Sequence, residues 1–281
     1  MYKDRGFDPG EDLPPNAAAL TQDLELDTLF GAMAVGDKFL LEVAKKAVLT
    51  SLDEPEAILY RQHILADCLE RPAIVEEMYA IAVEAIEREK KVWGVLLGRY
   101  PEGTLHRSVE VIKQFVDLLK RLRNIADEHG AKFRSEGLTM FFRMLTKELD
   151  DEYLGSVEDH LRRLAFRDGV LMSAELDNGN KGTLYVLRKP RNTKQTWMEQ
   201  LQTWMEQTLL KDRSDYVYQI ADRDESGFRA LSELRGQGIS LVASALGQSA
   251  DHILSFFRML RSELGFYVGC LNLRDRLAKK G

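Results

Sequence analysis

The sequence is poor in the residues that usually mark a metal-binding or disulfide-stabilised protein. It has two cysteines, Cys68 and Cys270, and no cysteines or histidines at zinc-ligand spacing. No apolar run approaches the ~20 residues needed to span a bilayer, and the charged start of the chain lacks the apolar centre of a signal peptide. We therefore expect a cytoplasmic protein with two buried, reduced thiols, no metal site and no membrane partner.

Motifs that bind nucleotides or build common hydrolytic sites are missing as well. The chain has no GxxxxGK[ST] phosphate loop, no GxGxxG, no HExxH and no GxSxG. Residues 179–182 contain a lysine between glycines, but they sit in a cluster of turn formers and not between a strand and a helix. The histidines are scattered. We therefore predict no catalytic residue, no enzymatic activity and no cofactor for these 281 residues themselves.

Proline and glycine are scarce, which leaves room for long helices. Apolar residues recur at three- and four-residue steps along most of the chain, and this spacing predicts a mainly helical, all-α fold. Residues 1–20 are predicted to be a disordered or loosely packed tail. Helices are expected at about 24–48, from a cap at Asp53 to Arg71, at 73–97, 105–128, 138–149, 151–164 and 194–222, and in a last stretch to about 279. Glycines are expected to interrupt the first helix at 36–37 and the last at 236–238 and 247.

Two features depart from this simple helical pattern. Short apolar runs on either side of the turn formers at 177–182 predict one small β-hairpin. The stripe from Ile253 to Leu271 is too broad for a helix with one buried side. Either the natural polypeptide continues, or this helix packs against the first one around Leu29, Met33 and Phe39. We predict the second.

Basic residues are fewer than acidic ones, but several of them are concentrated beside the predicted hairpin. The chain has 39 basic and 45 acidic residues, a net charge of −6, whereas a dedicated nucleic-acid binder is usually basic. Yet residues 178–198 contain no Asp or Glu and five basic residues, Lys181, Arg188, Lys189, Arg191 and Lys194. These side chains are candidates for non-specific contact with DNA phosphates. The alternative is an ordinary solvated strand edge whose charges discourage aggregation.

Three stretches add a family resemblance. Leu24–Asp27 leads into a helix, Pro55–Gln62 places an acidic turn before an isoleucine and an Arg-Gln pair, and Asp251–Cys270 is a long apolar helix near the end. Together with the order of elements, these stretches resemble the MutS family of DNA mismatch repair ATPases. They are most similar to bacterial MutS-like proteins without the mismatch-reading N-terminal domains.

The resemblance spans residues 24–280 and implies the helical core and lever, in which long helices carry a DNA clamp at their tips. It implies a tail at 1–23, a core and outgoing lever at 24–165, a reduced clamp hairpin at 166–192, and a returning lever and final core helix at 193–281. It also implies weak, non-specific binding of duplex DNA and an ATPase domain of the same polypeptide, absent here, that holds ATP and magnesium. A homodimer is a further candidate partner. The competing hypothesis is a helical scaffold or dimerisation module with no DNA role.

Overall fold

The computed structural model describes residues 3, 6–8, 10, 12–95, 101–165, 172–177, 181–187 and 225–280. These residues are mainly helical, which confirms the all-α class. Contacts divide the chain into two compact units. Unit 1 comprises Met1–Leu97, His106–Ala165 and Leu246–Gly281, and unit 2 comprises Gly98–Leu105 and Phe166–Ala245.

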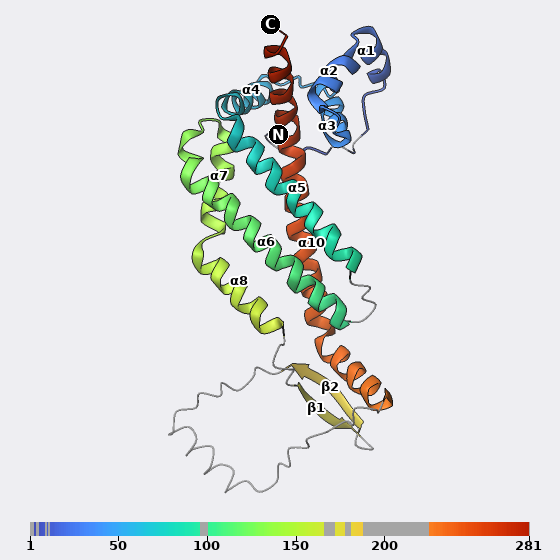
Figure 1. Ribbon diagram of the computed structural model, residues 1–281. Helices are drawn as coiled ribbons and strands as arrows, with labels where there is room; N and C mark the ends of the chain where they lie inside the picture. The colour runs from blue at the N-terminus through green and yellow to red at the C-terminus, as the bar shows by residue number, and fades with distance from the viewer. Residues whose placement is uncertain are drawn as a thin grey trace. The chain divides into compact units, whose positions relative to one another are not determined.

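Helices account for nearly all of the described part of unit 1 (Figure 1). In chain order the helices are α1 (Ala17–Asp23), α2 (Leu26–Ala34), α3 (Lys38–Leu49), α4 (Pro55–Glu70), α5 (Pro72–Val95), α6 (Pro101–His129), the 3-10 turn η1 (Gly130–Lys132), α7 (Glu136–Glu148), α8 (Asp151–Leu164) and α10 (Glu225–Ala278). Both α6 and α10 begin in unit 2 and continue into unit 1.

Prolines begin three of these helices, because the missing N–H of a first helical residue costs nothing there. Pro55, Pro72 and Pro101 are the first residues of α4, α5 and α6. The predicted cap at Asp53 is wrong by one residue, since the residue before α4 is Glu54 and its side chain makes no capping hydrogen bond. The fixed φ of proline decides this start, not a side-chain cap.

The predicted interruption of the first helical stretch at 36–37 is confirmed. Backbone φ is +49° at Val35 and +87° at Gly36, which ends α2 in the left-handed region. Asp37 then caps the start of α3, with its carboxylate accepting hydrogen bonds from the backbone N–H groups of Phe39 at 2.7 Å and Leu40 at 3.2 Å.

Helix α10 is unbroken, so the interruptions predicted at 236–238 and 247 are wrong. It runs for 54 residues from Glu225 to Ala278. A glycine inside a helix costs about 1 kcal/mol relative to alanine, but it keeps its N–H and does not clash with the preceding turn. A few glycines therefore lower helix propensity without ending the helix.

The C-terminal half of α10 is the centre of unit 1. Its four consecutive residues Ser262, Glu263, Leu264 and Gly265 are all buried, which requires neighbours on every side of the helix. The ring of Phe257 lies 5.4 Å from that of Phe115 on α6, measured between centroids. Helices α2 and α3 cover another face and α5 a third (Figure 1).

The predicted packing of the last helix against the first is confirmed. Phe30 and Met33 of α2 form a buried cluster with Ala44 and Leu49 of α3, and Phe266, Cys270 and Leu273 of α10 pack against it. The side-chain amide of Asn272 donates a hydrogen bond to the Met33 carbonyl at 2.8 Å. A Cβ on Gly269 would lie 3.2 Å from the Met33 Cε atom, so this glycine lets the helices approach closely.

The prediction of a loosely packed tail through residue 20 is wrong for several of its residues. Ala17 begins α1 and is buried. Phe7, well before any helix, is only 6% exposed. An isolated phenylalanine in a polar segment has no periodicity, so the sequence gives no sign that it reaches the core.

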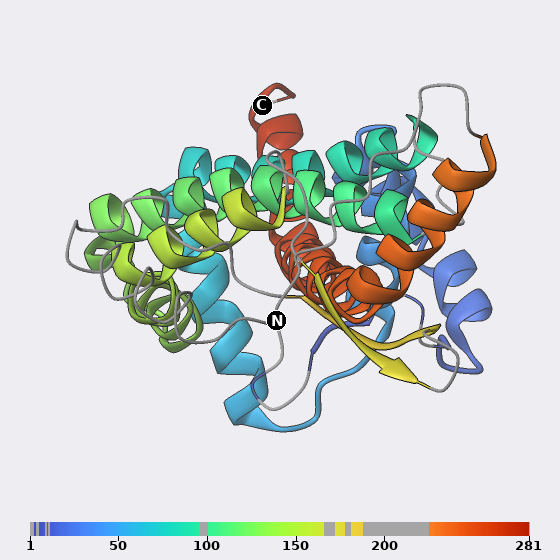
Figure 2. The ribbon, with the colours of Figure 1, turned by 90° about the horizontal axis from the view of Figure 1, so that it is seen from below.

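Helices α5, α6 and α8 of unit 1 pack side by side (Figure 2). Glu84 of α5 pairs with Arg121 of α6, and Lys120 of α6 pairs with Glu158 of α8. Helix α7 packs on α4, where Gly137 allows close contact: a Cβ there would lie 2.6 Å from the Tyr60 hydroxyl oxygen.

In unit 2 two short strands pair antiparallel at the position where the sequence has its two apolar runs. Strand β1 is Met172–Asp177 and β2 is Lys181–Leu187. The register shifts between Ser173 and Glu175, where a β-bulge adds one residue to β2. Residues 178–180 of the predicted turn and the helix predicted at 194–222 lie outside the described residues.

The close contact at Gly137 gives the first prediction. In Gly137→Ala, the new Cβ would also meet Ile64 Cδ1 at 2.7 Å, so α4 and α7 must separate or repack. We expect a loss of about 1–3 kcal/mol in the free energy of unfolding, measured by urea titration. The matched control is Gly155→Ala in α8, which meets nothing within 4 Å and is expected to stabilise. Equal effects of the two substitutions would contradict this packing.

Candidate nucleic-acid interface and the core that supports it

The structure describes one of the five predicted DNA-binding residues. Lys181 is the first residue of β2, and its partner across the ladder is Asp177, the last residue of β1. The other predicted residues, Arg188, Lys189, Arg191 and Lys194, lie outside the described residues. The structure therefore neither brings the five together nor separates them.

The described part of the hairpin is not basic. Strand β1 contributes Glu175 and Asp177, and β2 contributes only Lys181. The basic stretch was counted from residue 178, and that count leaves out the acidic residues of β1. Strand pairing places one of them, Asp177, opposite Lys181. Basic character in this part of the chain therefore begins after β2.

Arg61 of the Arg-Gln pair in α4 has a role that the sequence does not predict. Its guanidinium carbon lies 4.5 Å from the centroid of the Phe266 ring on α10. Both terminal nitrogens lie 3.5 Å from the Ala47 carbonyl oxygen at the end of α3. Arg61 thus joins α3, α4 and α10 through a cation–π contact and weak hydrogen bonds. We call this set the Arg61 contact.

The two thiols lie beside the Arg61 contact. Burial raises the pKa of Cys68 to about 12, with smaller contributions from the negative charge of Asp67 and from Cys270. Burial raises the pKa of Cys270 to about 11, and the charge of Arg61 partly opposes this. Cys68 is buried as predicted, whereas Cys270 is half-buried. Both thiols stay protonated at neutral pH, a state in which a thiol is a poor nucleophile.

A buried carboxylate on α4 fixes the start of α7. Asp67 Oδ2 accepts hydrogen bonds from the backbone N–H groups of Arg134 at 3.0 Å and Ser135 at 2.7 Å. Asp67 is 5% exposed, so these bonds replace the water that its charge would otherwise need. Such contacts hold the turn before α7 against α4.

Ion pairs tie α5 to α6 at two levels. Arg107 Nη2 lies 2.8 Å from Glu89 Oε1, and the Glu89 side chain is only 8% exposed. About three to four turns further along α6, Arg121 Nη1 lies 2.6 Å from Glu84 Oε2, and Arg88 pairs with the same carboxylate. The hydrogen bond from Arg121 lowers the pKa of Glu84 below its usual value.

A second pair of contacts ties α6 to α8. Lys120 Nζ lies 2.5 Å from Glu158 Oε1, and Arg123 Nη1 lies 2.5 Å from Asp151 Oδ1. Exposed ion pairs of this kind add little stability each. Charges placed in register along antiparallel helices nevertheless disfavour sliding of one helix along another, because a shift separates all of the pairs.

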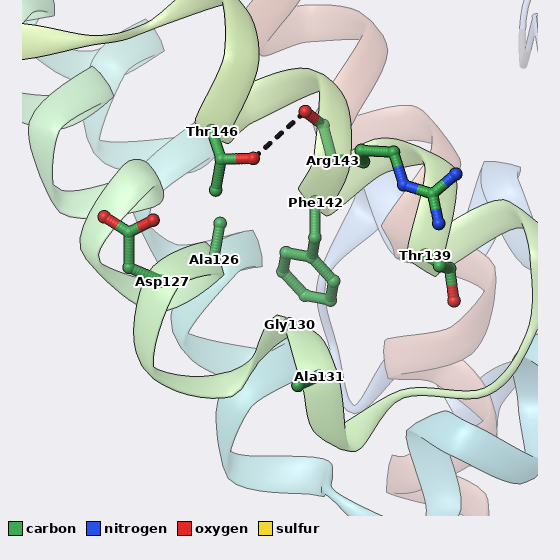
Figure 3. A pocket seen from close by; sticks show the side chains of 8 residues that line it. All are labelled: Ala126, Asp127, Gly130, Ala131, Thr139, Phe142, Arg143 and Thr146. Carbon is green, nitrogen blue, oxygen red and sulfur yellow. Dashed lines mark hydrogen bonds between the residues drawn. The ribbon is translucent and has the colours of Figure 1, made fainter.

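A hollow of about 340 Å³ opens between the end of α6, η1 and α7 (Figure 3). Its lining residues are Ala126, Asp127, Gly130, Ala131, Thr139, Phe142, Arg143 and Thr146. The Thr146 hydroxyl donates to the Arg143 carbonyl at 3.1 Å. Asp127 pairs with Arg123 at 3.4 Å. Thr146 is thus bonded to backbone, and Asp127 to a side chain that does not line the hollow. We assign the hollow no chemical role.

Within the described residues no three His, Cys, Asp or Glu side chains gather in a way that could hold a metal ion. None of the described helices combines the length and apolar character that a membrane crossing needs.

Comparison with known proteins decides the family. The model of the MutS2 N-terminal domain matches residues 53–280, from just before α4 to the end of α10. The chain belongs to the MutS2 N-terminal domain family. This confirms the expected relationship to the MutS family, whereas α1, α2 and α3 lie before the matched region. No curated protein and no solved structure matches the chain.

The buried ion pair between α5 and α6 gives the second prediction. Arg107→Met leaves the Glu89 carboxylate buried without its cation, and we expect a loss of about 3–5 kcal/mol in unfolding free energy. Adding Glu89→Leu should recover much of that loss, since the uncompensated charge is gone. Chemical denaturation of the single and double variants measures both effects.

The control for this cycle is Arg162→Met in α8, because Arg162 forms a 3.0 Å pair with Asp159 while both side chains are mostly exposed. That change should cost less than about 1 kcal/mol. If the double variant is as unstable as Arg107→Met alone, the buried charge is not the cause.

Proposed function

We propose that this chain is the core and lever region of a MutS-like protein, which couples non-specific contact with duplex DNA to an ATPase domain of the same polypeptide. The observation that carries the proposal is the continuous helix α10. Its 54 residues would span roughly 80 Å at 1.5 Å per residue. Residues of this helix belong to both units, and in the proposal the helix is the element that connects the hairpin-bearing unit with the core.

The contacts of α10 in unit 1 suit a transmitting helix. Its side chains meet α2, α3, α5 and α6 at once. Arg261 shows the density of these contacts: its guanidinium carbon lies 3.7 Å from the Phe39 ring centroid, and its Nε lies 3.5 Å from the Tyr79 hydroxyl oxygen. A displacement of α10 along its axis would disturb several helices together, which a lever requires.

The proposed DNA contact is electrostatic. Arg188, Lys189, Arg191 and Lys194 would bind phosphates without reading base edges, as clustered basic side chains do. Lys181 is the weakest member of the set, because its ladder partner is acidic. The net charge of −6 weakens DNA binding further. Low salt strengthens phosphate contacts through counterion release, so binding should be easiest to measure there.

The proposed ATPase domain would bring the ATP and magnesium that this chain has no motif to bind. A homodimer is compatible with the same proposal. The competing function is a helical scaffold or dimerisation module without a DNA role, and the acidic balance of the chain favours it. DNA binding by the basic segment distinguishes the two.

The DNA proposal gives the third prediction. Binding to a short duplex should have a Kd on the order of 10⁻⁴–10⁻⁶ M at physiological salt and be indifferent to sequence and mismatches. Replacing Arg188, Lys189 and Arg191 with alanine removes up to three phosphate contacts. The slope of log K against log salt should then fall by up to about 3. Fluorescence anisotropy across a salt series measures both chains.

A matched control removes the same charge elsewhere. Lys147, Lys279 and Lys280 are exposed, and their replacement with alanine should leave the slope within about one unit of the parent value. If the two triple variants behave alike, net charge alone controls binding. Absence of binding by the parent at low salt would favour the scaffold function.

The fourth prediction concerns nucleotides. The purified chain should neither bind nor hydrolyse ATP, because its sequence has no phosphate loop to surround the phosphates with backbone N–H groups. Calorimetric titration with Mg-ATP should give only heats of dilution, and a phosphate-release assay should match the buffer blank. A saturable binding curve in the micromolar range would overturn the assignment of ATP to a separate domain.

A further inference from the structure

A short segment at the start of the chain is bound in the core as a peptide would be. Phe7 packs against Val43 and Ala47 of α3, and the partly buried rings of Phe39 and Phe266 close the same cluster. Among residues 3–12 the described ones form no helix or strand. The segment is therefore held by its contacts with unit 1 and not by its own secondary structure.

Two buried charged side chains bind the backbone of this segment. Glu263 of α10 accepts a hydrogen bond from the Phe7 N–H at 2.6 Å, and its residue is 7% exposed. Lys46 of α3 donates to the Asp12 carbonyl at 2.6 Å and is 3% exposed. Burying a charge is costly unless it is paired and hydrogen-bonded. A ligand in this groove must therefore offer a backbone N–H to Glu263 and a backbone carbonyl to Lys46. Backbone hydrogen bonds beside an aromatic anchor are a usual mode of peptide recognition.

A third contact extends the segment toward α4 and α7. Lys3 Nζ lies 3.9 Å from carboxylate oxygens of both Glu56 and Glu136. The bound pattern is thus a basic residue, an aromatic residue four positions later and a backbone carbonyl five positions after that. The segment and α3, which supplies one wall, precede the region matched by the family.

We propose that the groove between α3 and α10 is a peptide-binding site that the chain fills with its own segment around Phe7 and Asp12. Its ligand class is a short peptide with one aromatic anchor. The resident segment keeps the site by its high effective concentration, because it belongs to the same chain. The same sequence supplied as a separate peptide is excluded while Phe7 is seated, and it enters when the anchor is lost.

The test uses the full chain and a fluorescein-labelled peptide with the sequence of residues 1–14. At the low concentration of a labelled tracer, anisotropy should show no saturable binding to the unaltered chain, because the resident segment occupies the site. The full-length Phe7→Ala variant should bind the peptide. The same peptide carrying Phe7→Ala should bind that variant on the order of a hundredfold more weakly, since the ring supplies the anchor.

Two controls separate an opened site from general loosening. Phe256→Ala removes a half-buried ring of α10 outside the groove, and that chain should not bind the peptide. In the unaltered chain, a large excess of unlabelled peptide should speed hydrogen exchange in residues 3–12, which needs no variant to fold. The proposal is overturned if a folded Phe7→Ala chain ignores the peptide, if both peptides bind it equally, or if Phe256→Ala binds as well. It is also overturned if excess peptide leaves exchange unchanged.

Discussion

The structure of unit 1 depends on one constraint, the enclosure of α10 from Leu260 to Leu271. A helix usually buries one stripe, but here successive residues are buried and every side must find a partner. Gly265 and Gly269 make this geometrically feasible. A Cβ on Gly265 would lie 3.3 Å from Val43, so small residues on this face set how closely α2 and α3 approach. The remaining faces take α5 and α6.

Close packing of this kind also buries polar side chains. The hydrogen bonds that these side chains form link distant parts of the sequence. Glu263 is bonded by the Phe7 N–H, Asp67 by the N–H groups before α7, and Arg61 by the carbonyl at the end of α3. Each bond joins a side chain of one helix to backbone of another segment. A shifted packing would leave a buried polar group without its partner, which costs more than the bond contributes when it is made. These contacts therefore select one arrangement of the helices, whereas apolar burial alone would tolerate several.

Most helices could be predicted because their signals are local. The 3.6-residue period places α5 to α8, and the width of the stripe around Phe257 and Tyr267 correctly demands a partner such as α2. The features that were predicted wrongly depend on tertiary contacts. The continuity of α10 through its glycines is decided by packing and not by propensity, and the burial of Phe7 is decided by a groove whose walls lie tens to hundreds of residues away. Arg61 could have been suspected from its place before the apolar end of α4, but its target Phe266 has no signal in the sequence.

The candidate DNA contact also depends on neighbours in space that the sequence does not show. A basic run along the sequence becomes a basic surface only if its neighbours in space are neutral, and β1 brings Glu175 and Asp177 to the hairpin. The proposed phosphate contact would then fall to the basic residues that follow β2 in the sequence. Within unit 1, the enclosure of α10 ties this helix to α2, α3 and the Arg61 contact, so a displacement of α10 would disturb all of them together.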